Sequence, residues 1–237
     1  MSDPDPRPMF EEIILPRRTP TRLNAMGSFS QLARRAGDIP EGSAPRTPAP
    51  KVMIGTQAFQ RCDITEGKPG IPLTLTLTIV DAANALAPIA GANAEIWHCD
   101  AEGVFSDYAS KPDPDAATTT YLRGAQTTNR GGQVTFTTIY PGWSGDRATH
   151  IVVRIYDGAT PKKTLQLGFP DAINATVYAD PHRYVKGQSP ITNNADPVFG
   201  DAPEGGTYGG RREFQIIAVA GDNAIGYVAT ARIAVHM

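Results

Sequence analysis

The sequence predicts an all-β fold, a sandwich or barrel, preceded by an extended proline-rich arm. Three observations support this fold class. Apolar and polar residues alternate with a period of two in several short segments after residue 71. Turns rich in glycine, asparagine and proline separate these segments, and no long helical periodicity lies between them. Short strands at this spacing are typical of sandwiches and barrels.

The first 54 residues form the predicted N-terminal arm. Proline and arginine are frequent there, and only 28–36 could form a short helix, with Ser28 as its N-cap. An arm of this composition is either disordered or wrapped around a neighbouring subunit. Phe10 and the apolar residues 13–15 favour wrapping. We therefore expect a homodimer or higher oligomer that forms through the arm.

Residues 55–237 are predicted to form one domain. Its first strand is the clearest, because Leu73, Leu75 and Leu77 alternate with threonines. Residues 170–179 allow one or two helical turns, and 221–226 has the composition of a hairpin turn. The further predicted strands are 133–140, 150–156, 214–220 and 227–235.

Composition excludes several classes of partner. The 237 residues carry a net charge of −2, so no basic surface points to nucleic acid or to an anionic membrane. No apolar run reaches the roughly 18–20 residues that a membrane span needs. The first ten residues lack the basic and apolar regions of a secretory signal, so we expect a cytoplasmic protein. Cys62 and Cys99 are then expected to be free thiols.

Seven segments together resemble the intradiol ring-cleavage dioxygenases, which are related to protocatechuate and catechol dioxygenases. The resemblance extends over about residues 60–235, and its most specific blocks are WHCDAEG and FTTIYPGW. It implies a β-sandwich, in agreement with the strand pattern. The segments are 63–81, 91–108, 121–126, 132–143, 147–150, 164–179 and 227–230.

The resemblance also implies where a metal would bind. Members of the family hold a ferric ion with two tyrosinates and two histidines, because hard phenolate oxygens stabilise Fe(III). At the matching positions this chain has Phe105, Ser144, His150 and Val152, so only one ligand is kept. We therefore expect no metal cofactor. The alternative is an Fe(III) site in which Tyr108 and Tyr140 substitute for the missing ligands beside His150.

Other features of the family's site persist. Arg147 matches an arginine that stabilises negative charge on the substrate, and Gln166 matches a glutamine of the neighbouring strand. Apolar cavities with a few polar groups are the usual small-molecule sites. We predict His150, Arg147 and Tyr108 as catalytic residues. The predicted substrate pocket comprises Trp97, Phe105, Tyr140, Trp143, Ser144, Val152 and Gln166.

Two of these residues have a plain structural interpretation as well. His150 is either a general acid or base or a hydrogen-bonded core imidazole. Arg147 either stabilises an enolate or phenolate or forms an ion pair with Asp146 or Glu95. Ser144 is interpreted as a loop serine, since no nucleophile motif surrounds it.

Three functions follow from these observations. The first is a repurposed enzyme of specialised metabolism that acts on an aromatic or polyene-like small molecule. It would be a cyclase or isomerase that uses acid–base chemistry without metal. The second is an intradiol dioxygenase with substitute iron ligands. The third is a non-catalytic subunit or a binding protein.

Overall fold

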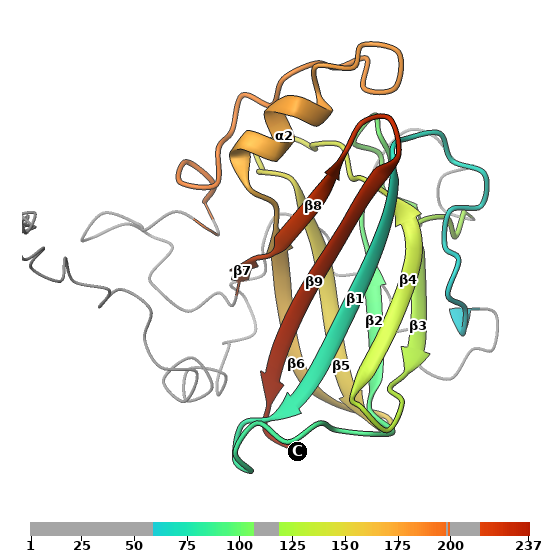
Figure 1. The fold of residues 1–237 in the computed structure, drawn as a ribbon, viewed down its shortest axis with the longest axis vertical. Coiled ribbons are helices and arrows are strands. Elements are labelled where there is room, and N and C mark those ends of the chain that lie inside the picture. The colour runs from blue at the N-terminus through green and yellow to red at the C-terminus, as the bar shows by residue number, and fades with distance from the viewer. Residues whose placement is uncertain (1–58, 107–118, 198, 200–213) are drawn as a thin grey trace, which may run out of the picture.

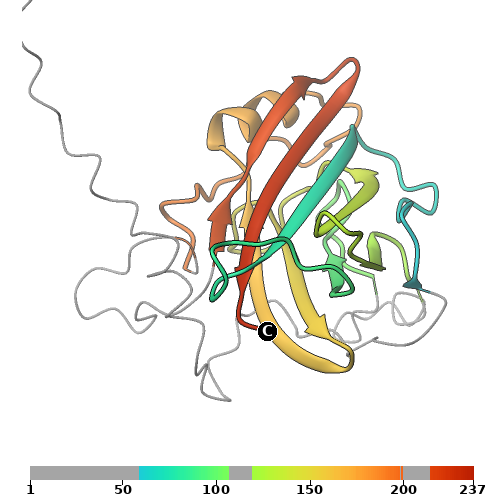
Figure 2. The same ribbon diagram turned by 60° about the horizontal axis from the view of Figure 1, so that its bottom comes forward.

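The computed structural model describes residues 59–106, 119–197, 199 and 214–237. The predicted arm, its short helix at 28–36 and Tyr108 lie outside these residues. Two β-sheets form two layers, and Figures 1 and 2 show them from two directions. One short helix, α2 (Asp171–Val177), lies at the end of the sandwich beside the turn between β8 and β9 (Figure 1). The all-β prediction is confirmed.

The strand order places the C-terminal strands in both layers. The four-stranded sheet has the order β4 (Gln133–Ile139), β1 (Pro72–Asp81), β9 (Gly226–Val235) and β8 (Ala218–Asp222). The five-stranded sheet has the order β3 (Arg123–Thr127), β2 (Asn93–Trp97), β5 (His150–Asp157), β6 (Thr160–Gly168) and β7 (Phe214–Ile216). Strand β1 pairs antiparallel with β4 and parallel with β9.

The period-two pattern explains how the layers pack. Leu73, Leu75 and Leu77 of β1 are buried between the sheets, and the intervening threonines lie on the outer face. From the other sheet, β5 contributes Ile151 and Val153 to the same core. The core is therefore the space between the two inner faces, as expected for a sandwich.

The structure corrects one predicted strand. Residues 214–220 do not form one strand in one sheet. They divide at Ile217 into β7 of the five-stranded sheet and β8 of the four-stranded sheet. The backbone N–H of Ile217 donates to the carbonyl of Gly168 on β6, which holds the chain at the point where it passes between sheets. The hairpin at 221–226 is confirmed by the antiparallel β8–β9 pairing.

Strand β5 is buried on both faces. Ile151 and Val153 face the core, whereas His150 and Val152 point to the opposite face and are also buried. Neighbouring β2 has the same property, since Ile96 and Trp97 are both buried on opposite faces. The five-stranded sheet thus has a second buried surface outside the main core.

The described part of the chain contains no helix that is long and apolar enough to cross a membrane.

The inward face of β4 gives a test of this packing. Phe136 is fully buried in the core, so Phe136→Ala should lower the free energy of unfolding by about 3–5 kcal/mol. Thr137 is the next residue and its side chain is exposed, so Thr137→Ala should change stability by less than about 0.5 kcal/mol. Chemical denaturation of both variants measures the difference. Equal losses would contradict the assigned register.

Candidate functional site

The candidate site lies on the outer face of the five-stranded sheet, beyond the main core. Trp97 of β2 pairs with Val152 of β5, which pairs in turn with Gln166 of β6. Directly paired residues of an antiparallel sheet share a face. His150 lies two residues before Val152 on the same face, opposite Gly168. The register therefore brings four of the predicted site residues together on one surface: Trp97, His150, Val152 and Gln166.

Aromatic side chains cover one end of this surface. The rings of Trp97 and Phe105 lie 4.7 Å apart, and the ring of Phe105 lies 6.1 Å from that of His150. Trp97 and Phe105 form a separate buried cluster with Cys99, distinct from the main core. The indole Nε1 of Trp97 donates to Ser106 Oγ at 3.2 Å, so its polar group is satisfied. Phe105 is thus packed as a hydrophobic residue, 7% exposed.

His150 is buried and its tautomer is determined by its partner. Nδ1 lies 2.8 Å from the carbonyl oxygen of Ala148. Because a carbonyl can only accept, Nδ1 carries the proton and Nε2 holds the lone pair. Burial, and next the charge of Arg147, lower the pKa of His150 to about 4. The side chain is therefore a neutral imidazole at neutral pH.

Arg147 is held by a carboxylate that the sequence did not suggest. Its Nε lies 2.9 Å from Asp196 Oδ2, and its Nη2 donates to Gln166 Oε1 at 2.5 Å. Asp196 also accepts the backbone N–H of Ala148 at 2.6 Å and that of Phe199 at 3.1 Å. The ion pair and the backbone contacts together fasten the segment around Asp196 to the start of β5.

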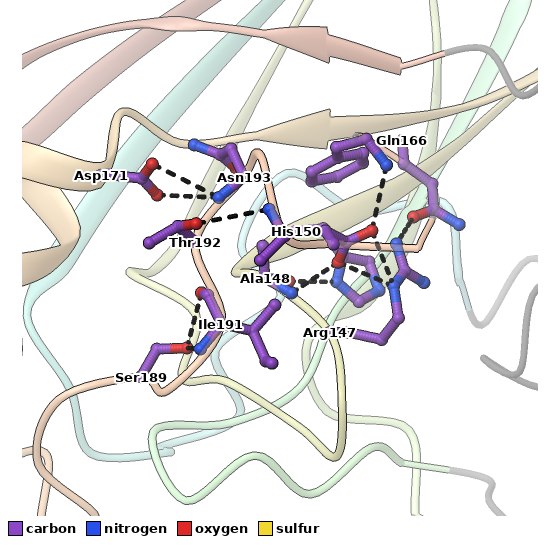
Figure 3. A network of polar contacts seen from close by, with 12 residues as sticks. Arg147, Ala148, His150, Gln166, Asp171, Ser189, Ile191, Thr192 and Asn193 are labelled. Carbon is purple, nitrogen blue, oxygen red and sulfur yellow. Dashed lines mark hydrogen bonds and ion pairs between the residues drawn. The ribbon is translucent and has the colours of Figure 1, made fainter. Parts of the chain in front are cut away.

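The same segment is fastened at a second point. The backbone N–H of Asn193 donates to Asp171 at the start of α2, and its Nδ2 donates to the carbonyl of Phe169 at 2.6 Å. Figure 3 shows Asn193 beside Asp171, with Arg147 at the far end of the network. The Oδ1 atom of Asn193 is buried and has no hydrogen-bond partner. Leaving such an acceptor unsatisfied costs roughly 1–3 kcal/mol.

Two predicted pocket residues belong to other surroundings. Tyr140 packs in the main core with Phe169, and its hydroxyl donates to Asn174 Oδ1 at 2.8 Å. Trp143 donates from Nε1 to the carbonyl of Gly187, and Lys186 lies over its ring. The structure does not bring either residue together with Phe105 and His150. Tyr140 was predicted as a substitute ligand four residues before Ser144, and Trp143 was predicted in the pocket from the family resemblance.

The other predicted residues divide as follows. Ser144 is half-buried in the turn before β5, and its carbonyl accepts the N–H of Arg147. That turn contacts the one leading to Phe105, because the N–H of Gly142 donates to the carbonyl of Asp100.

Tyr108 lies outside the described residues. Arg147 pairs with Asp196, and Glu95 pairs with Arg123, so the proposed Arg147–Glu95 pair is wrong.

His98 lies away from this surface, as its strand position predicts. Its Nε2 lies 2.7 Å from Thr138 Oγ1 of β4, on the side of the core. His98 and His150 therefore lie on opposite faces of the sheet and cannot bind one metal ion together.

Sequence and structure comparisons identify the class of protein. A dioxygenase family model matches residues 53–172, about half of the chain. The fold and the resemblance of the site blocks agree with this match. The chain belongs to the intradiol ring-cleavage dioxygenase family.

Solved structures support the same family. An intradiol ring-cleavage dioxygenase from Tetranychus urticae matches with 28% identity over 75% of this chain and 87% of that chain, at a TM-score of 0.61. The dioxygenase domain of a fusion with a carbohydrate-binding protein from Streptomyces sp. SirexAA-E has the same fold, with 23% identity over 85% and 98% of the chains and a TM-score of 0.53. No curated protein matches the chain.

The described residues do not fit the family's ferric ion. Phe105 and Val152 carry no donor atom, and they occupy two of the four matching ligand positions. His150 is the one imidazole on the surface described above. In the described ranges no group of three or more His, Cys, Asp or Glu residues could hold a metal.

Loss of the ion pair between Arg147 and Asp196 should destabilise the protein. Asp196→Asn removes the carboxylate charge from the buried ion pair with Arg147, so it should lower the free energy of unfolding by about 3–5 kcal/mol. The control is Asp157→Asn, because Asp157 is 59% exposed in its pair with Lys162. This variant should lower the free energy of unfolding by less than about 1 kcal/mol. Denaturation curves compare the two, and a small loss in Asp196→Asn would show that the pair is not structural.

The buried histidines predict a loss of stability in acid. Burial lowers the pKa of His98 as well as that of His150 to about 4, against an ordinary 6.5. Below pH 6.5 the unfolded chain binds protons that the folded chain excludes until about pH 4. Unfolding free energy should therefore fall over this window, by up to about 1.4 kcal/mol per pH unit for each histidine.

His150→Gln should remove one of these two contributions. Urea denaturation at several pH values between 7 and 4 would then give a shallower slope than the parent chain. An unchanged slope would mean that His150 titrates normally.

Proposed function

We propose that this family member is an enzyme that works without the ferric ion and catalyses a proton-transfer reaction of an uncharged small molecule. One observation carries the proposal. Two positions that match iron ligands are occupied by Phe105 and Val152, and both are packed into the site surface, Phe105 against Trp97. Apolar, buried side chains at these positions are expected of a site adapted to lack the metal.

His150 is the residue we assign as acid–base catalyst. Its Nδ1–H is committed to the carbonyl of Ala148, so Nε2 is the atom that takes a proton from the substrate. Because its pKa is low, the imidazolium that forms returns this proton readily to another atom of the substrate. One bond to hydrogen breaks and another forms, so the product is an isomer and no oxidant is consumed. Isomerases and proton-driven cyclases share this balance.

Arg147 supports this chemistry by its charge. A buried guanidinium near His150 disfavours the imidazolium and stabilises an enolate or phenolate that forms on the substrate. Asp196 balances its charge before substrate binds. Because the pair Arg147–Asp196 and the imidazole together carry no net charge, they favour an uncharged substrate. The rings of Trp97 and Phe105 favour an aromatic or polyene-like body.

A dioxygenase with substitute ligands is less well supported. Of the residues it would use, Tyr140 donates its hydroxyl to Asn174 within the main core. Burial raises the pKa of Tyr140 far above its ordinary value, which disfavours a tyrosinate. His98 faces Thr138 on the other side of the sheet.

We propose a cytoplasmic location for the protein. Cys62 and Cys99 are both free thiols, which suits a reducing cytoplasm. We also propose that the chain forms a homodimer or higher oligomer through its N-terminal arm. Size-exclusion chromatography of the full chain against a chain that begins at residue 55 would test it.

Metal content tests the proposed function. The purified full chain should hold far less than one iron per chain and should consume no oxygen with catechol after ferric loading. The matched variant carries Phe105→Tyr, Ser144→Tyr and Val152→His, which restores the family's donor set. It should gain ferric affinity and a visible tyrosinate absorption. Stoichiometric iron with oxygen uptake in the parent chain would overturn the proposal.

One further assay distinguishes the proposed enzyme from the third possible function, a non-catalytic subunit or a binding protein. Small molecules that the full chain converts are offered to His150→Gln. If this variant converts each of them as fast as the parent chain does, the site does not carry acid–base catalysis.

A further inference from the structure

One hydrogen-bond donor of the candidate site has a fixed direction and no acceptor. The Oε1 atom of Gln166 accepts from Arg147 Nη2 at 2.5 Å. Because a guanidinium can only donate, this contact determines which end of the amide is the oxygen, and Nε2 lies on the side turned away from Arg147 (Figure 3). Within the described part of the chain Nε2 donates to no atom, although the residue is only 5% exposed.

The surface beside this amide is open towards one edge of the sheet. Nε2 is not one of the fully buried side-chain atoms that lack a partner among the described residues, so part of it reaches solvent. Gln166 pairs with Phe214 of the edge strand β7, and Phe214 is 39% exposed. Over Gly168 the surface is closed, because a Cβ there would lie 2.7 Å from Ile216 Cδ1 and 2.9 Å from Phe199 Cε2. The accessible part of the site therefore lies over Gln166 and Phe214.

Aromatic rings connect this opening with the imidazole. The ring of Phe214 stacks on that of Phe199, with centroids 5.0 Å apart. Phe199 in turn meets the ring of His150 edge to face, at 6.4 Å. His150 is also the diagonal neighbour of Gln166, because it pairs with Gly168, and such neighbours are roughly 7–8 Å apart. This separation matches the size of a small ring compound.

We propose that Gln166 Nε2 donates a hydrogen bond to a carbonyl oxygen of the substrate, and that the apolar body of the substrate packs on Phe214. The inference rests on the proposed function and names the substrate class of the same site, an uncharged ketone. When the base takes a proton from the carbon next to the carbonyl, the electron pair of the C–H bond moves to the oxygen and gives an enolate. Return of the proton to another atom gives an isomer.

The contact of Gln166 with Arg147 strengthens the proposed donor. A hydrogen bond accepted at Oε1 polarises the amide, so Nε2–H becomes a better donor to the enolate oxygen. The positive charge of Arg147 thus acts on the substrate through the amide, while the guanidinium keeps its ion pair with Asp196.

Acetophenone and α-methylstyrene are the probes that isolate this contact. They have the same flat shape and differ in a carbonyl oxygen against a CH2 group. Each is titrated into the full chain while the backbone amide signals of β6 and β7 are followed by NMR. Acetophenone should bind about tenfold more tightly, the effect of one buried hydrogen bond. Its carbonyl stretching frequency should fall when it is bound.

Three variants assign the effect to these residues. Gln166→Glu keeps an acceptor for Arg147 and replaces only the donor, so the affinity for acetophenone should fall about tenfold and that for α-methylstyrene should not change. Gln133→Glu makes the same exchange at an exposed position of β4 and should change neither affinity. Phe214→Ala should weaken the binding of both probes by a similar factor, because it removes the apolar contact that they share.

Deuterium uptake separates this inference from the proposed function. In D2O the methyl protons of acetophenone should exchange in the site, and His150→Gln should abolish this exchange. Binding that depends on Gln166 without deuterium uptake would support the inference and count against the proposed proton transfer. Deuterium uptake with equal affinity of acetophenone for the parent chain and Gln166→Glu would support the proton transfer and overturn the inference. A parent chain that binds neither probe would overturn the inference as well.

Discussion

Strand β5 is buried on both faces, and this constraint determines the rest of the site. One face, with Ile151 and Val153, closes the core between the two sheets. The other face carries His150 and Val152 and needs a cover of its own. Any side chain placed there must be apolar or must bring its hydrogen-bond partners with it, because a buried polar group without partners is costly.

The polar residues of the second face meet this requirement by pairing. Arg147 binds Asp196 and Gln166, while Arg123 binds Glu95. Buried pairs of this kind contribute little net stability, yet the loss of one partner is severe. Here their effect is to hold neighbouring segments of the chain in position. The pair at Arg147 fastens the segment that carries Phe199 and Asn193 against the start of β5 and the end of β6.

Much of the fold could be predicted from the residues themselves. The leucine–threonine alternation predicted β1, and the composition of 221–226 predicted the turn before β9. The division of 214–220 into two strands could not be predicted, because the segment FQIIAVA is one mostly apolar run with no turn residue where the chain changes sheet at Ile217. Strand β6 was not predicted from its own pattern, since its first half is polar and lies at the exposed end of the hairpin.

The site was predicted in part. The strand register explains why Trp97, His150, Val152 and Gln166 converge on one face. Asp196, Asn193 and Phe199 had no such signal. They lie in a polar stretch without periodicity, and only the folded chain brings that stretch to His150. Tyr140 was expected in the pocket as a substitute ligand near Ser144, and Trp143 was expected there from the family resemblance. The Tyr140 hydroxyl donates to Asn174 and the Trp143 indole to the carbonyl of Gly187 instead.

The state of the His150 ring tests the central claim most directly. A long-range proton–nitrogen NMR spectrum of the purified full chain at pH 7, assigned by comparison with His150→Gln, reports both ring nitrogens. The structure predicts a sharp neutral imidazole with the proton on Nδ1 and a lone pair on Nε2. A signal broadened by a paramagnetic ion, or one with both nitrogens protonated, would contradict a metal-free site with a neutral base.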